Sequence, residues 1–369
     1  MQMRIILCGG GTAGHVTPAI AIAEEIRKSY PTSAILFIGR EGGNENRAVQ
    51  KSDIALRTIS LSGLKRSLSP QNIKVISDAL KAKRKAKEII REFNPDIILG
   101  TGGYVCWPVI MAGHEFGIKT AIHESNVTPG LTTKILAPFC NLILLGHQES
   151  IKKLNSRGKK VVVGNPILQD FKKINRESAR KKLGLKDDDL FILSFGGSIG
   201  AEKMNDVIIE LIENYSSKES KIKHLHATGE RYYNNTKYAK YKTEFLGCKI
   251  LPYIENMPTH LCAADIVICR CGALTLSEIS AAGVPSILIP SPNVSSNHQY
   301  KNAKKIYDKG AALLIEEKDL DFNRLKDTVN RLKNDKNGRK NKAKRILALS
   351  TPHAARDTAN ELKMLIYGI

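Results

Sequence analysis

The stretch LCGGGTAGHVTPAIAIAEEI, residues 7–26, decides the fold class. The apolar run MRIILCG leads into it, three glycines follow, and a helical pattern continues from about Pro18 to Lys28. A strand, a glycine turn and a helix open a doubly wound α/β domain, and the N–H groups at such a helix start can face a phosphate. Gly9-x-Gly11-x-x-Gly14 also fits the dinucleotide fingerprint. The first question is therefore whether this loop holds a nicotinamide cofactor or some other phosphate.

The same alternation of short apolar strands and helices continues along the chain. Strands are expected at SAILFIG, PDIILGTGG, KTAIHES, NLILLG and KKVVVGNP, and then at DLFILSFGGSIG, KIKHLHATGE, CKILPYI, DIVICRCGA, PSILIPSP and GAALLI. Two such series predict two Rossmann-like domains with doubly wound parallel sheets. We place the first at residues 1–163 and the second at 164–349, with a C-terminal helix at about 350–369 that can pack back onto the first.

Composition narrows the class of protein. The chain has 369 residues, 42% hydrophobic and 25% charged, as expected for a globular protein. Its net charge of +21 fits either a basic face for anionic partners or a Lys-rich proteome. The basic run KNDKNGRKNKAKR, residues 333–345, contains no aromatic residue, so a solvated loop or helix face is favoured over a nucleic-acid site. Seven cysteines without a C-x-x-C pair indicate neither a disulfide framework nor a zinc site, which fits a reducing cytoplasm. No apolar run reaches the ~18 residues that span a bilayer, so membrane contact is expected to be peripheral.

The nicotinamide interpretation meets two difficulties. It needs a carboxylate at the end of the second strand, but that strand ends at Gly39-Arg40. Arg40 would suit a phosphorylated ribose, which weakens the interpretation without removing it. His15, directly after the third glycine, stands where a dinucleotide fold usually has an apolar packing residue.

Two further motifs are weaker. Gly196-Gly197-Ser198-Ile199-Gly200 follows a strand and matches the nucleophile elbow G-x-S-x-G, with Asp265 and His298 downstream in the order that a hydrolase requires. Short motifs of this kind occur by chance, so a hydrolase is disfavoured. KDDDL, residues 186–190, resembles a metal-binding D-x-D, but its place between a helix and a strand favours a solvated turn.

The segment CRCGALTLSEISAAGVPSILIPSP, residues 269–292, carries the strongest signal. A strand ends at Cys269, Gly272 turns the chain, and a helix opens. Its free N–H groups and roughly +0.5 of macrodipole charge can hold a diphosphate without a metal. Glu278 on this helix can accept two hydrogen bonds from a ribose diol. The alternative is a capping pattern, since Thr275 and Glu278 have the spacing [ST]-x-x-[DE].

The order of several motifs along the chain favours the first interpretation. The sequence resembles the MurG family, glycosyltransferases of GT-B architecture in which two Rossmann-like domains face each other across a cleft. The blocks that carry the resemblance are GGGTAGHVTPA (9–19), GTGGYVCWP (100–108), HESNVTPG (123–130), GNP (164–166), GGSIGA (196–201), CGALTLSE (271–278) and HQYKNA (298–303). The resemblance implies transfer of N-acetylglucosamine (GlcNAc) from UDP-GlcNAc, with inversion, to the 4-hydroxyl of undecaprenyl-pyrophosphoryl-MurNAc-pentapeptide (lipid I).

The resemblance also implies roles for individual residues on the donor side. Ile254 would meet uracil through its backbone, Glu278 would hold the ribose, and Gln299 would hydrogen-bond the GlcNAc hydroxyls. The diphosphate would be held at the start of the second-domain helix and in the second glycine loop, by Ala273, Leu274, Thr275, Leu276, Ser277 and Ser198. The sugar would be met from the first domain by Asn126, Thr12, Ala13 and Gly14. No metal or cofactor is implied.

On the acceptor side the resemblance places Gly102, Gly103 and Tyr104. The first glycine loop is then expected near the acceptor diphosphate rather than on a dinucleotide. A base must take the proton of the attacking hydroxyl, and His15 is our first candidate because an imidazole titrates near pH 6.5. Glu124 is the second. The alternative for His15 is a residue that only positions the acceptor.

A lipid-linked acceptor requires contact with the cytoplasmic face of an anionic membrane. Residues 62–91 mix apolar with basic side chains, and their loop GLKRSLSP, residues 63–70, is the better membrane candidate, because the helical part fits an ordinary amphipathic helix on the sheet. Trp107 fits either an interfacial anchor or a core residue.

Some positions depart from the common family pattern. Ser125 stands in place of a glutamine in HESN, and Leu168 stands where many members have an arginine that contacts phosphate. These departures leave the acceptor peptide and sugar open. Competing functions are another GT-B enzyme that uses UDP-GlcNAc, either a 2-epimerase or a glycolipid synthase, and a catalytically silent nucleotide-sugar-binding protein.

Overall fold

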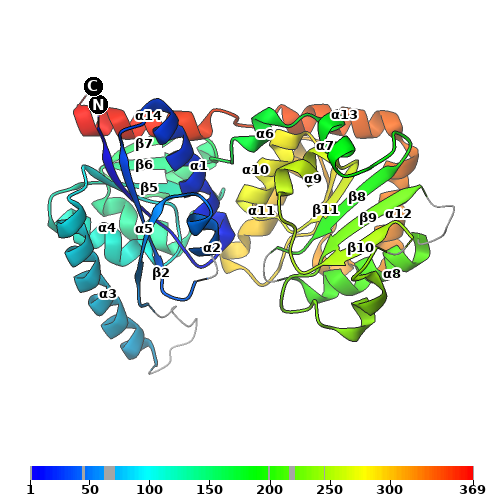
Figure 1. Ribbon diagram of the computed structural model, residues 1–369, viewed down its shortest axis with the longest axis horizontal. Coiled ribbons are helices and arrows are strands. Elements are labelled where there is room, and N and C mark those ends of the chain that lie inside the picture. Colours follow the sequence, from blue (N-terminus) through cyan, green and yellow to red (C-terminus); the bar gives the residue numbers. More distant parts are fainter. Residues whose placement is uncertain are drawn as a thin grey trace. The chain divides into compact units, whose positions relative to one another are not determined.

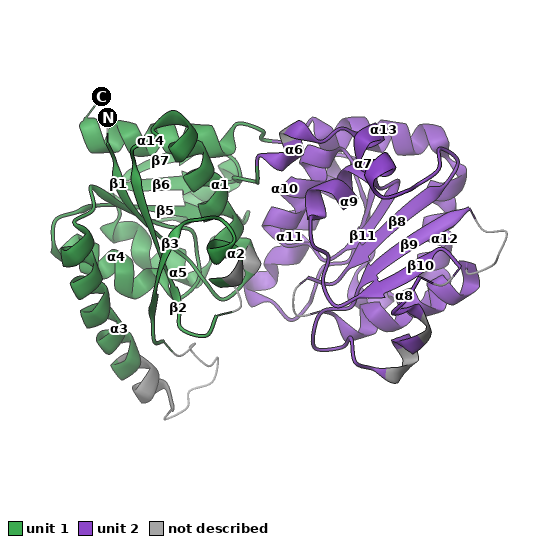
Figure 2. Ribbon diagram, viewed as in Figure 1, with its two compact units in different colours: residues 1–168, 351–369 green, residues 169–350 purple. Residues whose placement is uncertain are grey.

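The computed structural model describes residues 2–43, 46–61, 71–197, 200–215, 221–244 and 246–368. Within these ranges it does not describe the side chains of residues 13, 47, 71–76, 172, 236, 237 and 240. The chain forms two compact units (Figure 2): residues 1–168 with 351–369, and residues 169–350.

The first unit is built on a parallel sheet of seven strands in the order β3-β2-β1-β4-β5-β6-β7, as far as the described residues show. The strands are β1 (Arg4–Cys8), β2 (Ala34–Arg40), β3 (Ala55–Ile59), β4 (Ile97–Gly100), β5 (Lys119–Glu124), β6 (Leu142–Leu145) and β7 (Lys159–Val162). The inner strands β4 and β6 are apolar throughout because helices cover both faces of the sheet. The order reverses next to β1, so the loops after β1 and β4 lie side by side at the carboxyl edge.

Helices cover both faces of this sheet (Figure 1), and an apolar core lies on each face. On one face lie α1 (Ala13–Ser29) and the C-terminal α14 (Ala354–Tyr367), which packs on α1 and buries Ala359 and Leu362. On the other lie α3 (Gln71–Phe93) and α4 (Cys106–Glu115), which pack on each other. The shorter helices of this unit are α2 (Asn46–Gln50), α5 (Leu131–Leu136), η1 (Ala137–Phe139) and η2 (Gln148–Lys153).

The second unit repeats the architecture with a parallel sheet of six described strands in the order β10-β9-β8-β11-β12-β13. These are β8 (Leu190–Phe195), β9 (Ile222–Ala227), β10 (Cys248–Leu251), β11 (Ile266–Cys269), β12 (Ser286–Leu288) and β13 (Leu313–Leu314). The helices are α6 (Asp170–Lys173), α7 (Arg176–Lys182), α8 (Glu202–Tyr215), η3 (Thr236–Tyr241), α9 (Met257–Ala263), α10 (Ala273–Ala282), η4 (Ser295–Asn297), α11 (His298–Asp308), η5 (Glu317–Asp319), α12 (Phe322–Asn334) and α13 (Lys336–Leu347). The face covered by α8 and α12 has a large aliphatic core.

The predicted fold class, two Rossmann-like α/β units with parallel sheets, is confirmed. Strand β3 was not expected from the sequence. It is an edge strand whose side chains are mostly exposed, so its apolar signal is weak. The basic run at 333–345 lies largely on α13, whose side chains are mostly exposed, as the solvated interpretation predicts.

The membrane-related expectations fall partly within the described residues. The described part of α3 buries Ala82, Ala86, Ile89 and Ile90 against the core, as an amphipathic helix on a sheet does. Trp107 is partly buried and packs on the same core. The loop at 63–70 lies outside the described residues. Among the helices that the structure describes, none combines the length and the apolar character needed to cross a bilayer.

Candidate active site

In the first unit, two glycine-rich loops contact each other through their backbones. They follow β1 and β4, and Gly10 N donates to Gly102 O at 3.2 Å. Gly103 has φ +85°, and a Cβ there would lie 2.0 Å from Gly10 O. Only glycine permits so close an approach. The structure thus brings the segment 9–14 together with Gly102, Gly103 and Tyr104, whose ring edge faces Gly11.

His15 stands in the first turn of α1, against the second of these loops. Its carbonyl accepts from Thr101 Oγ1 at 2.6 Å, and its half-buried ring lies on Gly102, where a Cβ would be 2.3 Å from Nδ1. Thr12, which precedes the helix, is exposed and makes no side-chain cap to it. The imidazole is therefore held at the carboxyl edge of the sheet, beside the exposed start of α1.

Glu124, at the end of β5, is 4% exposed and uses both carboxylate oxygens. Oε1 accepts from the N and the Nδ2 of Asn126, each at 2.9 Å. Oε2 accepts from Gly130 N at 2.8 Å and from Thr133 Oγ1 at 2.6 Å. A carboxylate with this many donors shapes its loop and orients Asn126, which fits a positioning role better than proton abstraction.

The residues on either side of Glu124 contact the segment at Gly164 and Asn165. His123 Nε2 contacts Gly164 O at 2.9 Å, and burial lowers the pKa of this imidazole. Ser125, one of the departures from the family pattern, accepts through its carbonyl from Asn165 Nδ2 at 3.1 Å. Leu168, the other departure, packs on the α1 side of the core, so an apolar residue suits its place.

In the second unit, the start of α10 forms the centre of the candidate site. The helix follows β11 through Gly272, and no side chain caps its first turn. The N–H of Leu276 bonds Gly272 O at 3.0 Å, so the N–H groups of Ala273, Leu274 and Thr275 are those that a helix start leaves without an intrahelical acceptor. Such a group of donors, with the positive end of the helix dipole, is suited to a phosphate.

Glu278 lies one turn further along α10. Its burial raises the pKa of the carboxyl to about 7, far above the ordinary value for glutamate. Tyr253, half exposed in the loop after β10, has a raised pKa because of burial and then of the charges of Glu278 and Glu255. Glu278 and Tyr253 therefore lie near each other at this edge. Ile254 is 1% exposed, so its side chain is not available to a ligand.

Gln299, in the first turn of α11, joins two loops of the same edge. Its Oε1 accepts from Cys271 N at 3.1 Å and from Ser291 N at 2.9 Å. Because only the oxygen of an amide can accept from N–H groups, these contacts fix the orientation of the side chain. The Nε2 donors are then directed away from Cys271 and Ser291.

The second glycine loop joins β8 to α8. Its expected ligand residue Ser198 lies outside the described residues, as does Ile199. Gly200 has φ +82°, and a Cβ there would lie 2.1 Å from Thr228 O, so the loop rests directly on the segment after β9.

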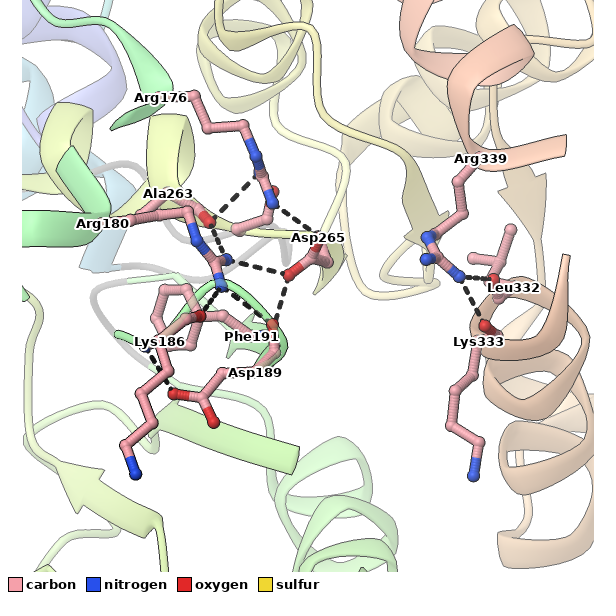
Figure 3. A network of polar contacts seen from close by, with 11 residues as sticks. Arg176, Arg180, Lys186, Asp189, Phe191, Ala263, Asp265, Leu332, Lys333 and Arg339 are labelled. Atoms are coloured by element: carbon pink, nitrogen blue, oxygen red, sulfur yellow. Dashed lines mark hydrogen bonds and ion pairs between the residues drawn. The ribbon is translucent and has the colours of Figure 1, made fainter. Parts of the chain in front are cut away.

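The structure disfavours the hydrolase interpretation. Asp265, its candidate acid, precedes β11 and so lies at the amino edge of the sheet, whereas the G-x-S-x-G loop follows β8 at the carboxyl edge. Figure 3 shows Asp265 bound to Arg176 at 2.6 Å and to Arg180 at 3.1 Å. Its carboxylate also accepts from Phe191 N at 2.9 Å. It is thus a structural ion-pair residue.

The KDDDL segment belongs to the same structural network. Asp189 Oδ2 accepts from Lys186 N at 2.8 Å and closes a turn, and Asp188 pairs with Lys221 at 2.5 Å on the surface. Within the described ranges, no group of three or more potential ligands is arranged to hold a metal ion.

Figure 3 also shows Arg339 of α13, which donates to the carbonyl of Lys333 at 2.6 Å and to that of Leu332 at the end of α12.

Two residues of this edge were missed by the sequence reasoning. One is Tyr253; the signal was an aromatic residue directly before Ile254. The other is Arg270, 9% exposed, which pairs with Glu317 and donates to Ile289 O at 3.2 Å. The signal for Arg270 was a lone charge at the end of an apolar strand. Its partner Glu317, 47 positions further along the sequence, gave no such signal.

Two family models and many curated relatives match most of the chain. Residues 5–145 match the glycosyltransferase family 28 N-terminal domain, and residues 191–361 match the glycosyltransferase family 28 C-terminal domain. A UDP-N-acetylglucosamine–N-acetylmuramyl-(pentapeptide) pyrophosphoryl-undecaprenol N-acetylglucosamine transferase from Thermoanaerobacter sp. (strain X514) is 44% identical over 327 residues, covering 88% of this chain and 89% of that protein. The protein of the same name from Acetivibrio thermocellus is 40% identical and covers 95% of each chain.

Solved structures give the same result for the fold. The crystal structure of Acinetobacter baumannii MurG superposes with a TM-score of 0.73 at 25% identity, covering 98% of this chain and 99% of that chain. A UDP-GlcNAc 2-epimerase from Neisseria meningitidis superposes with a TM-score of 0.67 at 14% identity, covering 98% and 100%. At that identity the second likeness concerns the fold alone.

Proposed function

The chain is a member of glycosyltransferase family 28, and on that premise we infer that it transfers GlcNAc from UDP-GlcNAc to the 4-hydroxyl of undecaprenyl-pyrophosphoryl-MurNAc-pentapeptide. The observation that carries this proposal is the carboxyl edge of the second sheet. There the uncapped start of α10, the Glu278 carboxyl and the oriented amide of Gln299 come from neighbouring elements. Their chemistry matches a diphosphate, a ribose and a sugar.

Each part of the donor has a matching group. The N–H groups of Ala273, Leu274 and Thr275 hold the diphosphate, with Leu276, Ser277 and Ser198 beside them. Ionised Glu278 accepts from the ribose diol, and the Nε2 donors of Gln299 reach the GlcNAc hydroxyls. The backbone of Ile254 meets uracil, and the exposed ring of Tyr253 offers a surface on which a base can stack. Main-chain donors neutralise the leaving UDP without a metal ion.

The first unit supplies the acceptor side, with Gly102, Gly103 and Tyr104 lining it. His15 accepts the proton of the MurNAc 4-hydroxyl, while the oxygen of that hydroxyl attacks the anomeric carbon. The new C–O bond forms as the bond to UDP breaks, and UDP leaves with the electron pair. Asn126, oriented by Glu124, and residues Thr12, Ala13 and Gly14 meet the sugar. We assign Glu124 the positioning of Asn126, because both its oxygens are engaged.

The reaction is tested by incubating the protein with labelled UDP-GlcNAc and a short-chain lipid I analogue. Formation of a β-linked disaccharide and of UDP is the expected result. A 2-epimerase would instead convert UDP-GlcNAc to its 2-epimer without an acceptor. Absence of the disaccharide with the protein folded would overturn the proposal.

A matched pair of variants tests the donor site. Glu278→Gln keeps the size of the side chain but weakens its acceptance from the diol, so KM for UDP-GlcNAc should rise roughly 10-fold. Glu210→Gln on the exposed side of α8 is the control and should leave KM unchanged. An equal response of the two variants would remove Glu278 from the donor site.

The first unit also carries the proposed membrane contact, at the cytoplasmic side. Leu131 is 66% exposed, Ile135 44% and Phe139 36%, all within α5 and η1, with exposed Lys134 among them. Apolar side chains next to a lysine favour an anionic membrane surface. These residues directly follow the 123–130 loop, so a docked membrane would hold the lipid-linked acceptor near it.

Flotation with vesicles that contain anionic lipid tests this contact. Leu131→Asp with Ile135→Asp should reduce the bound fraction several-fold, and replacement of Lys65 and Arg66 by serine should reduce it further at physiological salt. Leu347→Asp, at an exposed apolar position of the second unit, is the control. Unchanged binding of both sets of first-unit variants would refute the contact.

A further inference from the structure

A connected set of polar side chains is buried in the core of the second unit. Ser194 lies on β8, His224 and His226 on β9, and Asn205 on α8, and none of the four is more than 1% exposed. They lie on the face of the sheet that α8 covers, among aliphatic residues such as Ile192, Ile208 and Ile250. Buried polar groups are costly unless they are fully hydrogen-bonded, so this arrangement calls for a reason.

The four side chains form one line of contacts. Ser194 Oγ lies 2.8 Å from His224 Nε2 and 2.8 Å from His226 Nδ1. His226 Nε2 lies 3.2 Å from Asn205 Oδ1. Asn205 Nδ2 donates to Thr228 O at 3.0 Å.

The last contact fixes the direction of all the others. A carbonyl only accepts, so Asn205 directs its NH2 to Thr228 and its Oδ1 to His226. His226 must then carry a proton on Nε2. Its Nδ1 lies 2.8 Å from the Ser194 hydroxyl and 3.2 Å from the Ser194 carbonyl oxygen, and in the neutral imidazole it accepts from the hydroxyl. Ser194 Oγ in turn accepts from His224 Nε2. Each group donates toward Thr228, and a second proton on His226 would break the link from the Ser194 hydroxyl.

The carbonyl at the end of this chain is also the one on which the second glycine loop rests. A Cβ on Gly200 would lie 2.1 Å from Thr228 O. The first turn of α8 connects the same parts again, since Asn205 N donates to Ala201 O at 2.8 Å. The position of Thr228 O therefore determines where Gly200 and Ala201 lie.

We propose that His226, aided by Ser194 and Asn205, is a positioning residue that sets Gly200 and Ala201, where the second glycine loop enters α8, for the diphosphate of the nucleotide sugar. The line of hydrogen bonds from His224 to His226 orients the Asn205 amide. The amide donates to Thr228 O, and Gly200 packs on that oxygen. This inference rests on the proposed function for the identity of the ligand. The hydrogen-bonded connection from His226 to Gly200 does not depend on the proposed function.

The place of each residue in this line of hydrogen bonds predicts how strongly its replacement should affect the loop. His226→Leu removes both the donor to Asn205 and the acceptor for Ser194. His226→Gln can still place an N–H donor toward Asn205 and should restore most of the function. His224 stands at the far end, and its Nδ1 has no partner among the described residues, so His224→Leu removes only a donor to Ser194 and serves as the control.

The experiment measures steady-state kinetics, UDP binding by calorimetry and hydrogen exchange of segment 200–205 in the full-length protein. We expect His226→Leu to raise KM for UDP-GlcNAc and Kd for UDP roughly 10-fold, and to speed exchange, with KM for the lipid acceptor unchanged. His226→Gln and His224→Leu should stay within about 3-fold of the wild type. These magnitudes correspond to the loss of one buried hydrogen bond to the loop.

Several results would overturn the proposal. They are unchanged KM and exchange in folded His226→Leu, an equal effect of His224→Leu, or no rescue by His226→Gln. If His226→Leu does not fold, Ser194→Ala takes its place, because it removes a single hydroxyl. Nitrogen-15 NMR of the wild type is a further test, and finding the His226 proton on Nδ1 would refute the direction of the chain. If wild-type protein bound no UDP while the exchange differences persisted, the proposed function would fail and the positioning would stand.

Discussion

The two glycine loops at the carboxyl edges of the two sheets have similar sequences and different supports. IILCGGGTAG (5–14) and FILSFGGSIG (191–200) share the order of strand, glycines and helix. The first loop rests on another glycine loop, backbone against backbone, at Gly10 and Gly102. The second rests on a carbonyl that buried side chains orient, through Asn205. A shared local sequence pattern therefore does not imply that the two loops are sensitive to the same changes. Both loops should respond to added volume, but only the second should respond to lost side-chain hydrogen bonds and to acid.

The largest effect is expected at His15, beside the first loop, where a substitution should change turnover without changing UDP binding at the second loop. His15→Ala should lower turnover by ~10² or more because it removes the proposed base, while UDP affinity stays unchanged. His353→Ala, at an exposed histidine of the same unit, is the control. Steady-state kinetics and UDP titration would measure both. Turnover near that of the wild type would leave His15 as a residue that only positions the acceptor.

Added volume should affect different substrates in the two loops. Gly103→Ala puts a Cβ 2.0 Å from Gly10 O and should lower acceptor kcat/KM ~10-fold or more. Gly200→Ala puts one 2.1 Å from Thr228 O and should raise KM for UDP-GlcNAc. Gly42→Ala and Gly184→Ala have positive φ but open space, and they control for backbone strain in each unit.

Kinetics with each substrate varied in turn would show which loop serves which substrate. The comparison between the loops would be broken if Gly103→Ala and Gly200→Ala changed the constants of the same substrate.

Mild acid should weaken the support of the second loop in particular. Burial lowers the pKa of His224 to about 3 and that of His226 to about 4. Both titrate near pH 6.5 when unfolded, so their contribution is complete above pH 6.5 and is lost as the pH falls toward 4. The double variant His224→Leu/His226→Gln should therefore have a flatter dependence of Tm on pH. We expect its Tm relative to the wild type to shift by roughly 5 °C between pH 7 and pH 5.5.

Glu278 changes the pH dependence of stability in the opposite direction. Its effect must therefore be separated from that of the two histidines. Its pKa is raised by burial to about 7, so its contribution is present below about pH 4.5 and is lost as the pH rises through 7. The difference in Tm between wild type and double variant at each pH cancels this effect. A parallel pH dependence of the two proteins would show that the imidazoles are not buried neutral supports.

The smallest effect is expected at the turn between α7 and β8, far from either loop. Asp188 and Lys221 pair at 2.5 Å, and the pair lowers the pKa of Asp188, but both side chains are exposed. Exposed pairs contribute little to stability, so Asp188→Asn should change Tm by less than about 1 °C and leave both KM values unchanged. Thermal unfolding of this variant gives the baseline for the others. A shift as large as that of the histidine variant would remove the contrast between buried and exposed polar contacts.

The sequence predicts much of this molecule and misses specific parts for physical reasons. Strands such as Arg4–Cys8 and Leu190–Phe195 are apolar runs followed by glycines, so the two parallel sheets could be read directly. Glu278 and Gln299 could be placed from their motifs. That Glu124 is saturated with donors could not be foreseen, because Gly130 and Thr133 reach it only after the loop folds back. His224 and His226 share a strand face by their spacing, but no pattern places Ser194 or Asn205 beside them.

The course of the chain makes the second unit an insertion in the first. The chain leaves the first unit after Leu168 and re-enters it at Thr351, and Asn165 N donates to Thr351 Oγ1 at 3.3 Å, so exit and return lie together. A single cut cannot separate the two units, since removing everything after Ser350 also takes away α14 and uncovers the α1 side of the core. Excision of residues 169–350 instead leaves two ends that a short linker can join, which makes a donor-free first unit an attainable reagent for studying the lipid-linked substrate alone.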